Sequence, residues 1–192
     1  MSLLGVLRVP PRGIPSAAAS RLAARLAGYA TGRVQDAVRI ERSEPSGRPL
    51  LTMDGKPASI YVSVSHLNQW CAVTLDATRS VGVDLAPLDA AHRLAAWLQP
   101  EDRWAGAGPS RVMPAYCWAA REAAFKAVRL DIPFCPDDFA LHALTDATFS
   151  WCYRVRHDSL TGLGRFSLHA GMVCALAWLD VAAIKESGVN PR

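Results

Sequence analysis

Three residues suited to chemistry are spaced four apart in the segment from residue 118 to residue 126, namely Trp118, Glu122 and Lys126. If the segment is helical, they share one face. A carboxylate beside an ammonium could hold a metal ion next to a phosphate. The same spacing also suits an exposed ion pair worth roughly 0.3–0.5 kcal/mol on a solvated helix. The surrounding Ala residues and Phe125 make the helix unusually apolar, which favours a partly buried face.

A further acid, Asp84, follows the run Val81-Gly82-Val83. A carboxylate at the end of a buried strand needs a partner, because an unpaired buried charge is costly. A hard divalent cation, which prefers oxygen ligands, would supply that partner. The alternative is an Asp that caps the turn before Pro87.

His66 follows an alternating segment that ends at Ser65. An imidazole at a strand end can donate a hydrogen bond to a phosphate, although a lone His is more often structural. Ser65 is not predicted to be a nucleophile, because the sequence has no G-x-S-x-G elbow and no ordered set of His and Asp partners.

The composition is that of a folded protein of 192 residues, with 51% hydrophobic and 20% charged residues and a formal net charge of +4. This length suits one large domain or two small ones. The positive balance fits an anionic ligand or partner. The Arg content raises the alternative of a nucleic-acid-binding module, but no basic run with interleaved aromatics supports it. We therefore expect no nucleic-acid partner.

Five Cys occur without a CxxC pair, which argues against structural zinc and favours reduced thiols in a cytoplasmic protein. The apolar run Gly171–Leu179 is too short to span a bilayer. No signal peptide is recognisable. We therefore expect a cytoplasmic protein without a membrane partner.

Apolar periodicity and turn residues predict the secondary structure. Residues 41–58 and Gly106–Pro109 are predicted to be loops. The predicted helices are Ser16–Ala30, with Ser16 as its cap, Ala90–Leu98 and Val112–Arg129. The predicted strands are Leu3–Val9, Ile60–Ser65, Cys71–Leu75, Val81–Leu85, 149–156 and 165–179. This order indicates an α+β protein with two similar halves that meet near residue 90.

Three segments together resemble a known family: Ser63-Val64-Ser65-His66, Val81-Gly82-Val83-Asp84, and Trp118 to Lys126, which is similar to W-x-x-K-E-A-x-x-K. The family is the 4'-phosphopantetheinyl transferase superfamily, and the likeness is greatest to the type that activates surfactin synthetase. The resemblance covers roughly Ser20 to Leu179. It implies a pseudo-twofold pair of α/β subdomains, residues 1–90 and 91–192, with the active site at their interface. Two fused halves favour a monomer.

The resemblance implies a magnesium-dependent transferase of the holo-[acyl-carrier-protein] synthase type. It would move the phosphopantetheine arm of coenzyme A to a serine of an acyl or peptidyl carrier protein. Asp84 and Glu122 would bind Mg²⁺, with Glu122 also accepting the serine proton. The coenzyme A phosphates would contact Lys126, His66 and Ser65.

Two further basic residues would contact coenzyme A by the same resemblance. The turn Gly47-Arg48-Pro49 would bring Arg48 near the adenylate, and Arg21 would reach the 3'-phosphate. Gly55-Lys56-Pro57 is a competing match for this turn. The first match is preferred because its spacing from Val38-Arg39-Ile40 fits better.

The chain departs from the family pattern at two positions. Ala86 stands where many members have a second acid, and Arg121 replaces the Lys before Glu122. The segment before the first helix is also short. These departures motivate an alternative function: a catalytically impaired homologue that binds coenzyme A or a carrier protein without transfer.

Overall fold

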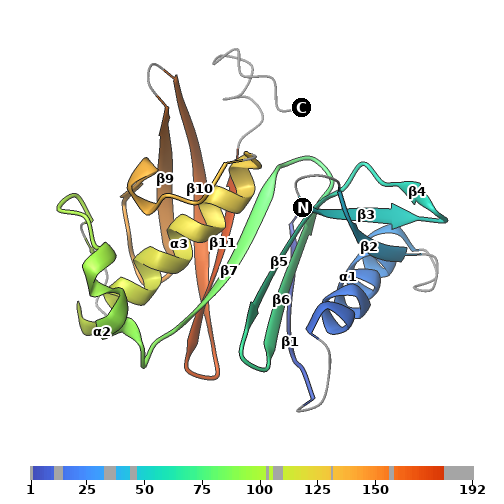
Figure 1. Cartoon of the computed structure of the whole chain (residues 1–192), viewed down its shortest axis with the longest axis horizontal. Helices are drawn as coiled ribbons and strands as arrows, with labels where there is room; N and C mark the ends of the chain where they lie inside the picture. The colour runs from blue at the N-terminus through green and yellow to red at the C-terminus, as the bar shows by residue number, and fades with distance from the viewer. Residues whose placement is uncertain are drawn as a thin grey trace.

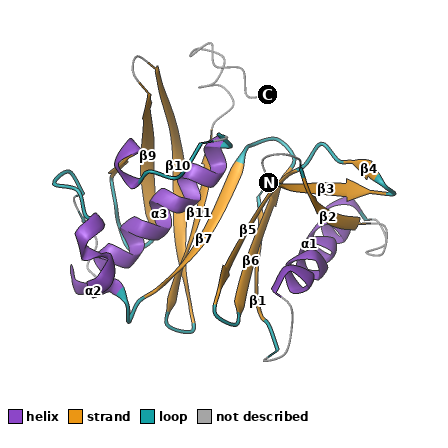
Figure 2. Cartoon of the chain, in the orientation of Figure 1, coloured by secondary structure: helices purple, strands orange, loops and turns teal. Residues whose placement is uncertain are grey.

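The computed structural model describes residues 2–10, 15–32, 38–43, 47–102, 104–105, 110–130, 132–155 and 158–179. Within them the fold is mixed α+β, as predicted, with three antiparallel sheets and three α-helices (Figure 1, Figure 2). The helices are α1 (Pro15–Thr31), α2 (Ala91–Leu94) and α3 (Met113–Val128). None of these helices is long and apolar enough to cross a membrane.

The first main sheet has the strand order β1-β6-β5, formed by β1 (Leu3–Arg8), β5 (Tyr61–Leu67) and β6 (Trp70–Asp76). Helix α1 packs on this sheet through small and aliphatic side chains such as Ala23 and Leu22. A small third sheet lies beside them, formed by β2 (Val38–Arg42), β3 (Pro49–Met53) and β4 (Lys56–Pro57) (Figure 1).

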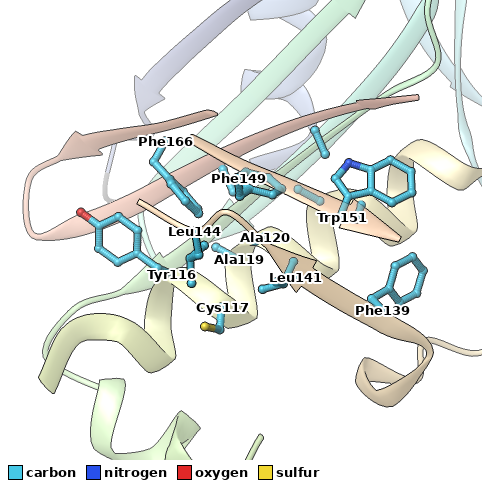
Figure 3. Packing of buried hydrophobic residues seen from close by; sticks show 14 of the residues in the cluster. Tyr116, Cys117, Ala119, Ala120, Phe139, Leu141, Leu144, Phe149, Trp151 and Phe166 are labelled. Atoms are coloured by element: carbon cyan, nitrogen blue, oxygen red, sulfur yellow. The ribbon is translucent and has the colours of Figure 1, made fainter. Parts of the chain in front are cut away.

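The second main sheet has the order β7-β11-β10-β9-β8. Its strands are β7 (Val81–Pro87), β8 (Phe139–His142), β9 (Thr148–Val155), β10 (Asp158–His169) and β11 (Met172–Leu179). Helix α3 crosses one face of this sheet (Figure 1). Beneath it lie aromatic rings from the strands. The ring centroids of Phe149 and Phe166 are 4.7 Å apart with the rings tilted, and Tyr116 of α3 meets Phe166 edge to face at 4.8 Å (Figure 3).

Gly82 sets how closely α3 approaches β7. A Cβ added there would overlap the backbone carbonyl of Ala123 and come within 2.7 Å of the Ala127 nitrogen. Both alanines are fully buried, so two small helical residues and one glycine allow the backbones to meet. This contact places the side chains of the helix beside the middle of β7, where Asp84 lies.

Replacing Gly82 with Ala should therefore push α3 away from β7 and lower the free energy of unfolding by about 1–3 kcal/mol, the usual range for overpacking. Urea denaturation of the variant and the wild type would measure the difference. An unchanged midpoint would mean that the helix can shift on the sheet without losing packing.

The two main sheets meet where β5 lies beside β7 (Figure 1). Between these two strands, serine hydroxyls rather than backbone carbonyls accept the hydrogen bonds of two backbone N–H groups. The Val83 N–H donates to Ser63 Oγ at 3.1 Å, and the Leu85 N–H donates to Ser65 Oγ at 3.3 Å. Both serines are at least 95% buried. We call this pair of contacts the serine seam.

Asp76, the last residue of β6, connects this strand to Ser2 near the N-terminus through hydrogen bonds. Its carboxylate accepts hydrogen bonds from the Ser2 hydroxyl, from the backbone and hydroxyl of Thr78, and from Arg79. Burial by itself would raise the pKa of Asp76, but these hydrogen bonds outweigh it and hold the pKa well below its usual range.

A depressed pKa means that the folded state favours the ionised carboxylate of Asp76. Its contribution to stability is complete above the unfolded value of about 4, and it is lost as the pH falls towards the folded value. Asp76→Asn should cost about 2 kcal/mol at pH 7 and clearly less at pH 3. Denaturation at both pH values checks this, and an equal cost at both would contradict it.

Most of the predicted elements are confirmed, with four corrections. Residues 41–58 are not one loop, because β3 and β4 lie within them. The segment 165–179 is a hairpin that turns at Ala170-Gly171, not one strand. Strand β8 was not predicted, and Ser16 lies inside α1 because that helix begins at Pro15. The predicted loop Gly106–Pro109 falls outside the described residues.

Candidate functional site

A cavity of about 500 Å³ opens where β5, β7, α2 and α3 come together. Most of the predicted site residues line it. Its polar lining consists chiefly of Ser65, His66, Asp84, Glu122 and Lys126. The predicted helical spacing of Trp118, Glu122 and Lys126 is confirmed, since all three belong to α3 and face this cavity.

The Lys126 ammonium, from the lining of this cavity, bridges the two acids. Lys126 Nζ lies 2.7 Å from Asp84 Oδ1 and 3.3 Å from Glu122 Oε1. It also donates to the Val83 carbonyl oxygen at 3.2 Å. The Asp84 side chain is 4% exposed, whereas Lys126 and Glu122 are 24% and 29% exposed. One acid is thus held inside the fold, and the other reaches towards solvent.

Burial and neighbouring charges shift the pKa values of Asp84 and Lys126. Burial raises the pKa of Asp84 to about 6, and the Glu122 charge adds to the rise, while contacts from Lys126 and Ser65 oppose it. Burial alone would lower the pKa of Lys126, but the two carboxylates outweigh it and raise the pKa. Lys126 therefore remains an ammonium, held between the two carboxylates.

Ser65 holds Asp84 in place. Its hydroxyl donates to Asp84 Oδ1 at 2.8 Å while accepting the Leu85 N–H of the serine seam. The hydroxyl group is therefore already engaged on both sides. His66, the next residue of β5, has an exposed side chain at the cavity wall.

A second cavity, of about 600 Å³, adjoins the first and shares Val64 and Lys126 with it. Three arginines line it: Arg42 from β2, Arg48 before β3, and Arg129 directly after α3. Among the described residues that line this cavity there is no carboxylate. This lining of cationic side chains suits a negatively charged group in the second cavity.

Arg48 is brought to this second cavity, whereas two other basic residues are not. Arg21 is exposed on α1 and lines neither cavity. Lys56, the alternative to Arg48, is exposed on β4 and also lines neither. The preferred turn, Gly47-Arg48-Pro49, is therefore the one that adjoins the cavities.

Arg121 points away from the site and into the core. It is 0% exposed and contacts Asp102 at 2.6 and 2.8 Å. It also donates to the carbonyl oxygens of Trp97 and Phe139, each at 3.0 Å. This guanidinium holds the segment after α2 and strand β8 against α3, and no phosphate can reach it.

Asp84 and Glu122 in the first cavity offer carboxylate oxygens, the kind of ligand that Mg²⁺ prefers. In the described part of the chain, no group of three or more His, Cys, Asp or Glu side chains could hold a metal ion. Mg²⁺ is often bound by only one or two carboxylates, with waters and substrate phosphates completing its shell. Among the described atoms, buried Asp84 Oδ2 has no hydrogen-bond partner, so it could serve as a ligand.

Sequence reasoning missed Arg42 and Arg129. Arg129 lies three residues after Lys126, so helical spacing could have placed it on the same side of the helix. Arg42 pairs with Pro49 in the β2–β3 hairpin, which brings it beside Arg48. That signal was lost once residues 41–58 were interpreted as loop.

No protein-family model matches this chain, and no curated protein matches it significantly.

Proposed function

We propose that this protein is a 4'-phosphopantetheinyl transferase, which moves the phosphopantetheine arm of coenzyme A to a serine of an acyl or peptidyl carrier protein. The observation that carries the proposal is the meeting of Asp84 and Glu122 on the Lys126 ammonium. An arginine-lined cavity next to this group supports a substrate with several phosphates.

In the proposed reaction, the serine oxygen of the carrier attacks the phosphorus that bears the pantetheine arm. The bond from this phosphorus to the bridging oxygen breaks, and adenosine 3',5'-bisphosphate leaves. Glu122, the more exposed acid, accepts the serine proton. Lys126 stabilises the charge that develops on the leaving phosphate. Ser65 fixes Asp84, and His66 is placed to donate to a phosphate oxygen.

Asp84 and Glu122 are the residues that would hold Mg²⁺. When bound, the ion would neutralise negative charge on the pyrophosphate. The buried, partnerless Asp84 Oδ2 supports this role. Ser65 and the backbone of β7 keep Asp84 in position whether or not the ion is present.

The order of elements supports a pseudo-twofold pair of subdomains. The strand order β1-β6-β5, with α1 on the sheet, has the same pattern as β7-β11-β10 with α3 on it. In each case a strand precedes the helix, and a hairpin follows later in the chain. Counted this way, the repeat divides the chain between Asp76 and Val81, slightly before residue 90.

Mass spectrometry of carrier proteins tests the function. Several purified carriers would be incubated with the enzyme, coenzyme A and Mg²⁺, and a phosphopantetheine mass gain on one serine is expected. Omission of Mg²⁺ and replacement of the acceptor serine by alanine are the controls. A complete absence of mass gain on fatty-acid, polyketide and peptide-synthetase carriers would count against transfer.

The second candidate is a homologue that binds coenzyme A or a carrier without transfer. Ala86 favours it, because this residue lines the first cavity two positions after Asp84, on the same face of β7. An acid there would point into the cavity. Tight binding of coenzyme A, measured by calorimetry, together with no mass gain on any carrier, would select this second candidate.

A further inference from the structure

Arg129 has a backbone conformation that disfavours its side chain. It follows the last residue of α3 with φ +60° and ψ +38°, the left-handed region. Its N–H donates to the Phe125 carbonyl oxygen at 3.4 Å and so caps the helix. Glycine is the usual residue at such a helix end because it lacks the Cβ that makes this conformation costly. A residue with a side chain at this position costs backbone strain, which indicates that the side chain has a function.

The surroundings of Arg129 provide that reason. Its guanidinium carbon lies 5.8 Å from the centre of the Tyr61 ring, which holds the side chain at the wall of the second cavity. Burial lowers the pKa of Arg129, and the nearby Arg48 charge lowers it further. Because Arg42, Arg48 and Arg129 line the same cavity, an anion bound there would be near three guanidinium groups.

Lys126 lines both cavities, whereas Asp84 and Glu122 line only the first. An anion among the three arginines is therefore a different group from the pyrophosphate proposed beside Asp84. Arginine forks match the oxygens of a phosphate monoester in shape and charge.

We propose that Arg129 is a specificity-determining residue that binds a phosphate monoester of the ligand in the second cavity. The inference rests on the proposed function for the identity of that ligand, coenzyme A, whose 3'-phosphate is such a group. It gives to Arg129 the contact that the sequence resemblance assigned to Arg21.

Two substitutions separate binding from folding. Arg129→Gly removes the charge and relaxes the backbone, whereas Arg129→Ala removes the charge and keeps the costly conformation. We expect both variants to bind coenzyme A at least tenfold more weakly, while the glycine variant melts at a higher temperature than the alanine variant. Arg129→Lys should recover part of the affinity. Arg154→Ala, at an exposed arginine of β9, is the matched control.

The ligand pair is coenzyme A and dephospho-coenzyme A, which differ by one phosphate monoester. In calorimetry the wild type should prefer coenzyme A, and Arg129→Gly should lose most of that preference by weakening only coenzyme A. An undiminished preference in Arg129→Gly would overturn the inference, even if transfer to carriers proceeds normally.

Inorganic phosphate provides a probe that does not depend on coenzyme A. It should raise the melting temperature of the wild type and have less effect on Arg129→Gly. If phosphate behaves in this way but coenzyme A does not bind, the anion site stands and the proposed function fails. If neither phosphate nor coenzyme A distinguishes the two proteins, the anion site itself is wrong.

Discussion

Replacing Asp84 with Asn should reduce the rate of phosphopantetheine transfer by about a thousandfold or more, in line with the loss of a charged group that acts on a transition state. Asparagine has nearly the same shape, so the cavity keeps its form. The variant lacks the buried anion that faces Lys126 Nζ at 2.7 Å. Lys126 keeps its contact with Glu122, so we expect the fold to survive.

The measurement is the initial rate of carrier modification, followed by mass spectrometry beside a thermal melt of each protein. Asp89→Asn is the matched control, because Asp89 is an exposed acid only five residues further along. It should transfer at the wild-type rate. Wild-type activity in Asp84→Asn would remove the basis of the proposed site, whereas a large loss of melting temperature would indicate a structural role.

Replacing Arg121 with Met should lower the free energy of unfolding by about 3–5 kcal/mol, the cost of leaving one member of a buried ion pair alone. Asp102 would keep a buried charge without its partner. The carbonyl oxygens of Trp97 and Phe139 would each lose a donor. Since Arg121 lies away from both cavities, any folded fraction should still bind coenzyme A.

Chemical denaturation of Arg121→Met and of the double variant Arg121→Met/Asp102→Leu tests this explanation. The double variant should regain much of the lost stability, because an apolar pair of similar volume does not leave a charge buried. Arg154→Met, at an exposed site, should change stability by less than about 0.5 kcal/mol. A single variant as stable as the wild type would mean that water reaches Asp102.

The sequence predicted α3 because no residue breaks the helix after Pro114, and it predicted β5, β6 and β7 from alternation, an apolar run and β-branched residues respectively. Pro114 in the first turn marks the start of α3, and alternation marks β5. Strand β8 escaped detection since Phe139–His142 is only four residues long. The hairpin at Ala170-Gly171 was hidden because apolar residues continue on both sides of the turn.

Within the site, residue types and spacing could identify Glu122 and Lys126 as neighbours, since both lie on one helix. That Asp84 meets them depends on Gly82, where β7 and α3 come close enough for the contact. No local pattern encodes such an approach. The direction of Arg121 was equally hidden, because its partner Asp102 lies 19 residues away along the chain.

The serine seam has a consequence for motion between the two sheets. The amide hydrogens of Val83 and Leu85 are protected by two rotatable hydroxyl groups, whereas ladder amides elsewhere are held by fixed carbonyls. A slight parting of β5 from β7 would expose both amides to deuterium without unwinding either strand. Their exchange rates would thus measure how often β5 and β7 separate next to Asp84.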